Sequence, residues 1–169
     1  KAATPLNIAP RGLVILVNFA DVKFETNKAE IDSMLTGKNY SRDYSYMYGG
    51  RKYFVTSNGS AWQYFYESSN GQYSPQFDVV GPVTVSKNMD YYGKNVSDFD
   101  AAPWDMVKEA CELVNDSVDF SLYDNDKDGD VDFVYVVYAG YGEADGGAAN
   151  TIWPHSYWLF KSGVTCKVD

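Results

Sequence analysis

The stretch DNDKDGDVDFVYVVY, residues 124–138, places closely spaced aspartates directly before an almost wholly apolar run. Three of the aspartates alternate along the chain, a glycine follows, and two more aspartates continue the alternation. The candidate metal ligands are therefore Asp124, Asp126, Asp128, Asp130 and Asp132. Together with Gly129 they match positions 1, 3, 5, 6, 7 and 9 of the calcium-binding loop of an EF-hand. This spacing favours a calcium loop over a solvated acidic turn.

A bound cation would explain how so much like charge can stand beside a strand that must be buried. Calcium takes about six to eight oxygen ligands, and glycine at the sixth place permits the sharp turn that brings them together. The twelfth place, usually a bidentate glutamate, is Tyr135, so other groups or water must complete the ligand set. Without a cation the carboxylates would repel one another and take up protons. We expect a structural ion that fixes a helix at 103–116 against a strand at 131–138.

Buried strands and capped helices alternate along the rest of the chain. The apolar run RGLVILVNFAD, residues 11–21, predicts a buried central strand. Short helices are predicted at 27–37, between Asn27 and Gly37, and at 60–71, where Ser60 and Gln63 form a capping box. Pro103 suits the first turn of the helix at 103–116. This alternation predicts an α/β fold with a mixed sheet.

Three further segments lie between these elements, and the first of them has no clear period. Residues 38–58 predict a long surface loop with at most a short hairpin at Gly49–Gly50. Residues 73–86 predict two short strands broken at Gly81–Pro82, and residues 89–100 predict a loop.

Composition narrows the possible partners. The chain has 169 residues, 45% of them apolar, and a formal net charge of −9, which fits one globular domain or part of a larger one. An acidic chain without a basic aromatic patch predicts no nucleic-acid partner. No apolar run approaches the roughly 18 residues of a membrane-spanning helix, so no membrane span is expected. The N-terminal residues lack the apolar core of a signal peptide, so any export signal would already have been removed.

The two cysteines, Cys111 and Cys166, do not form a CxxC pair, which excludes a zinc finger and a thioredoxin-type motif. Cys111 lies on the apolar side of the helix at 103–116 and is predicted to be a small buried hydrophobic residue. A bridge to Cys166 or to a partner chain stays open. Cysteine content therefore does not fix the redox compartment.

The sequence lacks several catalytic motifs. It contains no GxSxG, P-loop, GxGxxG or HExxH, and it has one histidine, His155, in WPHSYW. A catalytic zinc site usually needs three protein ligands, which one histidine cannot supply. A histidine beside three aromatic residues is more typical of a packed, hydrogen-bonded side chain than of a ligand. A Cys–His couple is disfavoured because Cys111 is expected to be buried and Cys166 lies in the tail.

Four segments occur in an order that resembles a known family. They are RGLVILVNFAD (11–21), FDVVGPVTVSKNMDYYG (77–93), LYDNDKDGDVDFVYVVYAGYGEADGG (122–147) and NTIWPHSYW (150–158). Together they resemble the N-terminal half of the catalytic domain of the immune inhibitor A family, secreted bacterial zinc metallopeptidases of the metzincin type. The aspartates match the acidic loop of that family position by position, which supports the calcium assignment.

The resemblance implies a fold and a domain organisation. The expected fold is α/β: a metzincin-like upper subdomain with a twisted mixed β-sheet, backing helices and a calcium loop. Residues 1–10 would be an N-terminal extension, 11–160 the upper subdomain, and 161–169 the start of a connection to a missing C-terminal half, which is then an expected partner.

The resemblance also implies an activity: zinc-dependent hydrolysis of peptide bonds in a peptide or protein substrate, by a secreted or cell-surface bacterial enzyme. In that family an HExxH helix follows the segment like WPHSYW, and it supplies zinc ligands and a general base. The zinc ligands are therefore expected outside this chain, which should be inactive alone. By analogy residues 146–158 would border the substrate cleft. The cleft candidates are Gly147, Thr151, Trp153 and His155; the alternative for this segment is core packing.

Two other functions stay open. One is a calcium-stabilised, aromatic-rich binding module for carbohydrate or a cell-surface ligand, which predicts exposed coplanar rings among Tyr40, Tyr44, Tyr46 and Tyr48. The other is a catalytically dead relative of the peptidase, for which the parent gene would lack a downstream HExxH.

Overall fold

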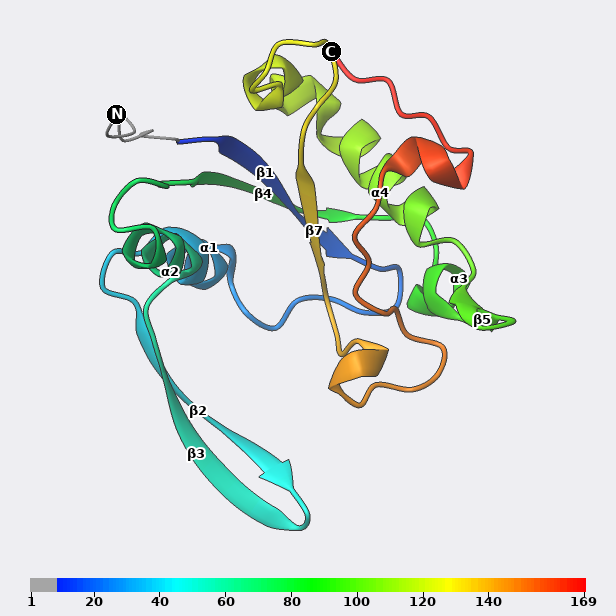
Figure 1. Cartoon of the computed structure of the whole chain (residues 1–169). Helices are drawn as coiled ribbons and strands as arrows, with labels where there is room; N and C mark the ends of the chain where they lie inside the picture. Colours follow the sequence, from blue (N-terminus) through cyan, green and yellow to red (C-terminus); the bar gives the residue numbers. More distant parts are fainter. Residues whose placement is uncertain (1–8) are drawn as a thin grey trace. The chain divides into compact units, whose positions relative to one another are not determined.

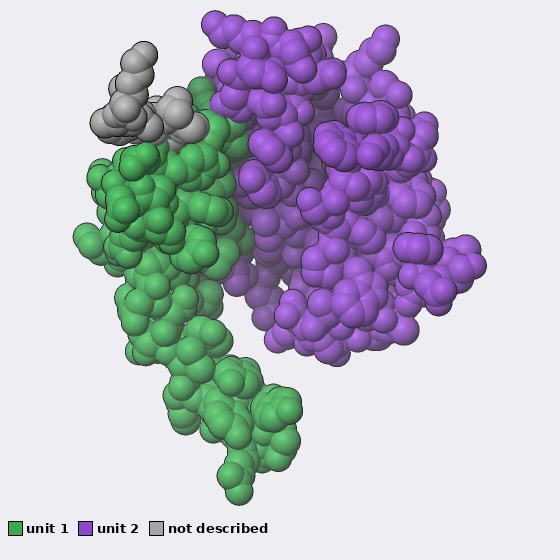
Figure 2. All heavy atoms as spheres, viewed as in Figure 1, with its two compact units in different colours: residues 1–12, 27–78 green, residues 13–26, 79–169 purple. Residues whose placement is uncertain are grey.

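The computed structural model describes residues 9–169, so the expected N-terminal extension lies almost wholly outside the described residues. The chain divides into two compact units (Figure 2). The first holds residues up to 12 and 27–78, and the second holds residues 13–26 and 79–169. Two of the boundaries between the units fall inside strands, β1 (Arg11–Asn18) and β4 (Gln76–Thr84).

The second unit is built on a three-stranded sheet with the order β4-β1-β7 (Figure 1). Its strands are β1 (Arg11–Asn18), β4 (Gln76–Thr84) and β7 (Val134–Tyr138). β7 pairs with β1 in parallel, from Leu13 opposite Val134 to Val17 opposite Tyr138. The predicted central strand is confirmed, although it ends at Asn18 and not at Asp21.

β4 also runs parallel to β1. At one end the N–H of Gln76 donates to the Pro10 carbonyl, and at the other end the N–H of Val85 donates to the Asn18 carbonyl, each at 2.9 Å. The three described strands therefore share one direction, and the expected mixed sheet is wrong. The antiparallel pairs of the described chain form separate two-stranded sheets.

The helix α4 (Pro103–Val114) covers one face of β1. The core cluster includes Leu13, Ile15 and Val17 of β1 together with Met106, Ala110 and Cys111 of α4. On the opposite face of β1, Val14 and Leu16 are also buried, which is why this strand has an unbroken apolar sequence. The predicted helix is confirmed up to Val114, and its last turn is a 3₁₀ turn, η1 (Asn115–Ser117).

β4 is one continuous strand across Gly81–Pro82, so the two short strands predicted for 73–86 are wrong. Pro82 has no N–H to donate, but β4 is an edge strand and tolerates this loss. Gly81 has a φ of +89°, and a Cβ built on it would lie 2.7 Å from the Leu16 carbonyl oxygen. Glycine therefore lets β4 approach β1 without interrupting the strand.

The prediction of a loop at 89–100 is also wrong, because these residues fold into a short helix and a small hairpin. These are α3 (Met89–Gly93), β5 (Asn95–Val96) and β6 (Phe99–Asp100). The Asp21 carboxylate accepts a hydrogen bond of 3.0 Å from the N–H of Met89. Met89 and Tyr92 are buried in the core. The hydrogen bond to Asp21 and the burial of Met89 and Tyr92 thus stabilise α3, which no local sequence pattern predicts.

The first unit contains the two predicted short helices, which lie side by side (Figure 1). They are α1 (Lys28–Thr36) and α2 (Ala61–Ser68). Asn27 Oδ1 accepts from the N–H of Glu30 at 2.9 Å, and Ser60 Oγ accepts from the N–H of Gln63 at 3.1 Å. Both predicted N-caps are therefore confirmed.

Residues 38–58, predicted to be mainly loop, form a long hairpin of β2 (Ser41–Tyr48) and β3 (Arg51–Asn58). The turn is at Gly49–Gly50, as predicted, with φ values of +56° and +75°. Two consecutive positive φ angles give a turn whose twist suits antiparallel strands. The prediction failed on the length of the strands, because both faces of the hairpin are exposed and no apolar–polar contrast marks them.

Short 3₁₀ turns complete the described chain: η2 (Phe120–Tyr123), η3 (Glu143–Asp145) and η4 (Leu159–Ser162). Residues 146–158, expected to border a cleft, form no regular strand. Among the described residues no helix has both the length and the apolar character needed to cross a membrane.

Candidate functional site

The aspartate loop joins η2 to β7. Tyr123 at the end of η2 is buried, and its carbonyl accepts a hydrogen bond of 3.1 Å from the N–H of Asp132. Val131 packs against the core cluster just before β7 begins at Val134. The loop is therefore held at both ends by the core of the second unit.

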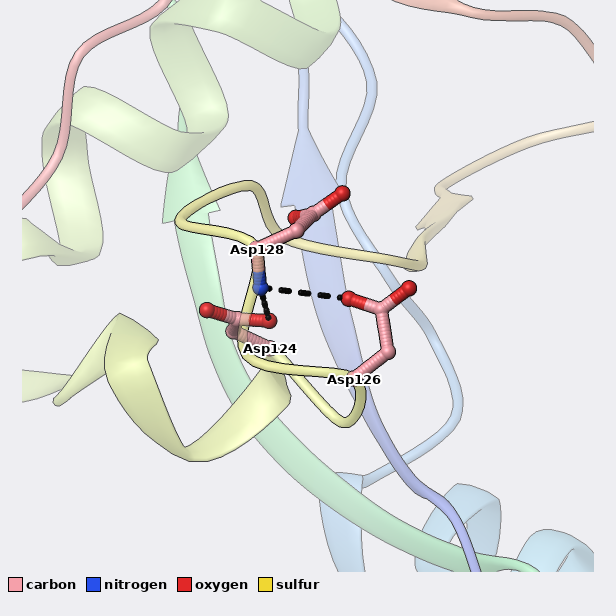
Figure 3. A group of neighbouring side chains, drawn as sticks. All are labelled: Asp124, Asp126 and Asp128. Carbon is pink, nitrogen blue, oxygen red and sulfur yellow. Dashed lines mark hydrogen bonds between the residues drawn. The ribbon is translucent and has the colours of Figure 1, made fainter.

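Three of the five predicted ligands converge (Figure 3). One carboxylate oxygen from each of Asp124, Asp126 and Asp128 lies within 4.8 Å of the other two. The negative charge of Asp128 is the main cause that raises the pKa of Asp126 above its ordinary value. The three groups thus repel one another, and a cation among them would remove that repulsion.

Each of these three side chains accepts a hydrogen bond from a backbone N–H group of the loop. The N–H of Asp128 donates to Asp124 Oδ1 at 3.1 Å and to Asp126 Oδ1 at 3.3 Å, as Figure 3 shows. The N–H of Gly129 donates to Asp124 Oδ2 at 2.9 Å. Gly129 and Lys127 have φ values of +94° and +64°, which fold the loop back on itself. The chain itself therefore gathers the carboxylates.

The other two predicted ligands are outside this group. Asp132 Oδ2 accepts hydrogen bonds from the N–H of Asn125 at 2.7 Å and from Asn125 Nδ2 at 2.9 Å. Asp132 therefore stabilises the loop by joining its two ends. Asp130 contributes its N–H to Asp128 Oδ1 at 2.9 Å, but its carboxylate is not part of the cluster. An ion bound to the three converging carboxylates would need further oxygens from backbone carbonyls or water.

Two of the cleft candidates, Gly147 and Thr151, lie in two successive turns that contact each other. The N–H of Gly147 donates to the Gly142 carbonyl at 2.9 Å, and Thr151 Oγ1 donates to the Ala148 carbonyl at 2.7 Å. A Cβ on Gly147 would lie 2.6 Å from Thr151 Oγ1 and 2.7 Å from the Gly142 oxygen. Glycine is required here because other parts of the loop approach so closely.

The other two candidates, Trp153 and His155, both contact Asp100, a residue that no sequence pattern singles out. Asp100, at the end of β6, accepts a hydrogen bond from the Trp153 N–H at 2.8 Å on Oδ2. The same oxygen lies 2.7 Å from His155 Nε2. Asp100 is 3% exposed, and its Oδ1 has no hydrogen-bond partner among the described residues. In the sequence Asp100 resembles its exposed neighbour Asp98, so only the fold distinguishes them.

Two tyrosines, Tyr138 and Tyr157, lie close enough to this carboxylate to feel its charge. Tyr138 of β7 donates from its hydroxyl to the Ile152 carbonyl at 2.7 Å, and the ring of Tyr157 stands edge-on to His155 at 5.9 Å. Burial first, and the negative charge of Asp100 second, raise the pKa of both tyrosines. Both hydroxyls therefore stay protonated at neutral pH, and that of Tyr138 is a hydrogen-bond donor.

These residues do not form a zinc site. The sequence has one histidine and no HExxH, and His155 is already engaged by Asp100. In the described part of the chain the aspartate loop is the group of carboxylate, histidine and cysteine side chains that meets the geometry of a metal site.

Comparison with known proteins decides the family. The model of the family described as "Immune inhibitor A peptidase M6, catalytic domain" matches residues 8–168. The chain belongs to the M6 peptidase family. The similarity to immune inhibitor A that the four sequence segments indicated is thereby confirmed.

A curated member of the M6 family shows how much of such a protein this chain represents. Immune inhibitor A from Bacillus thuringiensis subsp. alesti is 29% identical over 171 residues. The alignment covers 86% of this chain and 25% of that protein. The chain therefore spans about a quarter of the length of the M6 relative that it matches.

Proposed function

We propose that this chain is the N-terminal part of the catalytic domain of a secreted bacterial zinc metalloendopeptidase, which hydrolyses peptide bonds in protein substrates. The observation that carries the proposal is the match to the M6 catalytic domain from residue 8 to residue 168. The mixed α/β fold is consistent with a peptidase domain. Membership of the family gives the reaction class, and the fold alone would not.

The zinc ligands and the general base belong, in this proposal, to a part of the protein beyond these residues. A catalytic zinc site needs about three protein ligands. The sequence has one histidine, His155, and that residue already forms a hydrogen bond with Asp100. In this proposal the chain forms part of the catalytic-domain scaffold and one border of the substrate cleft. Alone it should be inactive.

The test is a peptidase assay of the full-length gene product on a fluorogenic protein substrate, with the 169-residue chain as the comparison. Zinc-dependent cleavage by the full-length product, abolished by a chelator and restored by zinc, is the expected result. A full-length product that lacks an HExxH motif, binds no zinc and cleaves nothing would instead support the catalytically dead relative.

The aspartate loop has a structural role in this proposal: it binds calcium through Asp124, Asp126 and Asp128. The convergence of the three carboxylates within 4.8 Å supports this assignment. The backbone N–H groups of Asp128 and Gly129 orient them in advance, so little ordering is needed when the ion arrives. The ion would fasten η2 and β7 to each other. Asp130 and Asp132 would then support the loop from outside the ligand group.

Residues 146–158 would border the substrate cleft. Trp153 is 46% exposed and offers an apolar surface to a substrate side chain, while its backbone is fixed by Asp100. Gly147 and Thr151 keep the preceding turn compact. Protein substrates bind along such borders through backbone hydrogen bonds and side-chain pockets.

The hairpin of β2 and β3 supports a second candidate function, a binding module for carbohydrate. Tyr44, Tyr46 and Tyr48 share one face with Tyr53, and all four are exposed. Tyr46 and Tyr53 stack at 5.5 Å with an angle of 16° between their rings. Tyr40, in contrast, is half-buried and outside the strands. Exposed, nearly parallel aromatic rings provide an apolar surface for sugar rings.

Binding to a panel of bacterial and host polysaccharides tests this second candidate. Tyr46→Ala should weaken binding at least tenfold if the stacked pair is the binding surface, because it removes one ring of the pair. Tyr141→Ala is a matched control, since Tyr141 is exposed and lies in the other unit. Equal binding by both variants would exclude the hairpin as a carbohydrate site.

A further inference from the structure

The C-terminal segment of the described chain lies on the second unit in an extended form. Its alternate residues Val164, Cys166 and Val168 are half-buried, and the residues between them are exposed. Cys166 and Val168 pack against the core cluster that contains Cys111 of α4. This alternation is typical of an extended segment with one face against a core.

Hydrogen bonds fix this segment along α4. Asp169 donates its N–H to Asn115 Oδ1 at 2.9 Å, and its carbonyl accepts from the N–H of Phe120 at 3.2 Å. Further back, Cys166 Sγ lies 3.9 Å from the carbonyl oxygen of Lys108. A helix carbonyl points toward the next turn, so the Lys108 oxygen faces the turn that carries Cys111.

The two thiols are consequently neighbours. Burial is the main cause that raises the pKa of Cys111 to about 12, and the electrostatic effect of Cys166 is the second cause. Burial also raises the pKa of Cys166, and Cys111 acts on it in turn through a side-chain hydrogen bond. Each thiol therefore influences the other directly, although 55 positions separate them in the sequence.

We propose that Cys111 and Cys166 form a disulfide bond that fastens the C-terminal segment to α4. These are the two cysteines of the sequence, and the fold brings both to one place against the core. The bond would close a long loop, the case in which a cross-link restricts the unfolded chain most.

The reaction is a thiol–disulfide exchange with a small-molecule or protein disulfide as the oxidant. The Cys166 thiolate attacks the oxidant and releases one thiol, which leaves a mixed disulfide. The Cys111 sulfur then displaces the second thiol. Two protons and two electrons leave the cysteines, and the oxidant is reduced to two thiols. Because the folded environment keeps Cys111 protonated, the bond should form during folding, before Cys111 is buried.

Peptide mapping of the full-length gene product tests the bond, independently of any peptidase activity. The protein is refolded with a mixture of oxidised and reduced glutathione, alkylated and digested without reduction. A cross-linked peptide pair that contains Cys111 and Cys166, at more than about nine-tenths occupancy, is the expected result. Recovery of both cysteines in alkylated form, or cross-linking of Cys166 to a second molecule, would overturn the proposal.

Limited proteolysis separates a cross-link from simple packing. Cys166→Ser removes the bond but keeps a small, half-buried side chain, so the variant should fold. Its C-terminal segment should be cleaved about tenfold faster than in the oxidised protein, and at the same rate as in the reduced protein. If oxidised, reduced and Cys166→Ser proteins are cleaved at equal rates, the segment is held by packing alone and the proposal is wrong.

Discussion

Nε2 of His155 lies 2.7 Å from Oδ2 of Asp100, a carboxylate that is 3% exposed and precedes it by 55 positions. The same oxygen accepts the N–H of Trp153 at 2.8 Å. One buried carboxylate therefore fixes both the ring of His155 and the backbone of the segment proposed to border the substrate cleft. An ionised Asp100 carboxylate can only accept, so in that state Nε2 of His155 is the donor of this hydrogen bond.

Asp100→Ala should lower the free energy of unfolding by about 2 kcal/mol, because it leaves the Trp153 N–H and the His155 ring without their acceptor. Urea unfolding monitored by tryptophan fluorescence measures this change. Asp98→Ala is the control, since Asp98 is exposed and an exposed substitution usually changes stability by less than about 0.5 kcal/mol. Equal losses in the two variants would show that the buried carboxylate does not hold the segment.

Calcium should raise the free energy of unfolding by about 2.7 kcal/mol when its concentration is one hundred times its dissociation constant, because it binds the folded loop. The measurement is urea unfolding with and without calcium. Asp124→Asn should abolish most of the gain, since Asp124 belongs to the converging group. Asp116→Asn, an exposed position outside that group, should keep it. If magnesium or no ion at all gives the same result as calcium, the assignment of the loop is wrong.

Asp126→Asn should have opposite effects with and without calcium. Repulsion by Asp128 raises the pKa of Asp126 in the folded chain, so its carboxyl favours folding while protonated. That contribution is lost as the pH rises through the raised pKa, so at neutral pH without metal the substitution should stabilise the protein. With calcium it should destabilise, because a ligand is lost. Thermal midpoints at pH 3 and pH 7 in chelator and in calcium check this; one sign throughout would contradict it.

Gly81→Ala should cost about 3 kcal/mol, the sum of a positive φ and a Cβ placed 2.7 Å from the Leu16 oxygen. Gly163→Ala separates the two causes, because Gly163 has a φ of +81° and no neighbour within 4 Å of a built Cβ. That control should cost only about 1 kcal/mol. Similar costs at the two positions, measured by chemical unfolding, would mean that β4 moves away from β1 without penalty.

Trp153→Ala in the full-length gene product should raise KM about tenfold on a protein substrate and leave kcat within about twofold, because a cleft border contributes binding and no chemistry. Phe160→Ala is the control, since Phe160 is also an exposed aromatic residue but lies outside residues 146–158. The assay is steady-state cleavage of peptides that differ in one side chain. Unchanged KM in Trp153→Ala would place the cleft elsewhere.

The sequence alone determined the elements whose signals are local. The N-caps Asn27 and Ser60, the first-turn Pro103 and the apolar run of β1 all act through residues close to them in the chain. The alternating aspartates predicted a tight acidic loop for the same reason, and three of the five side chains converge. Local spacing could not show that the carboxylates of Asp130 and Asp132 are not part of this group.

Tertiary structure decided the features that depend on distant partners. Asp100 is buried because β6 lies beneath the segment that carries His155, and Cys111 meets Cys166 because the tail lies along α4. β4 continues across Gly81–Pro82 because β1 runs beside it. In each case the deciding contact joins residues far apart in the chain. A local pattern specifies the backbone conformation of a segment, but only chain folding specifies which segment it contacts.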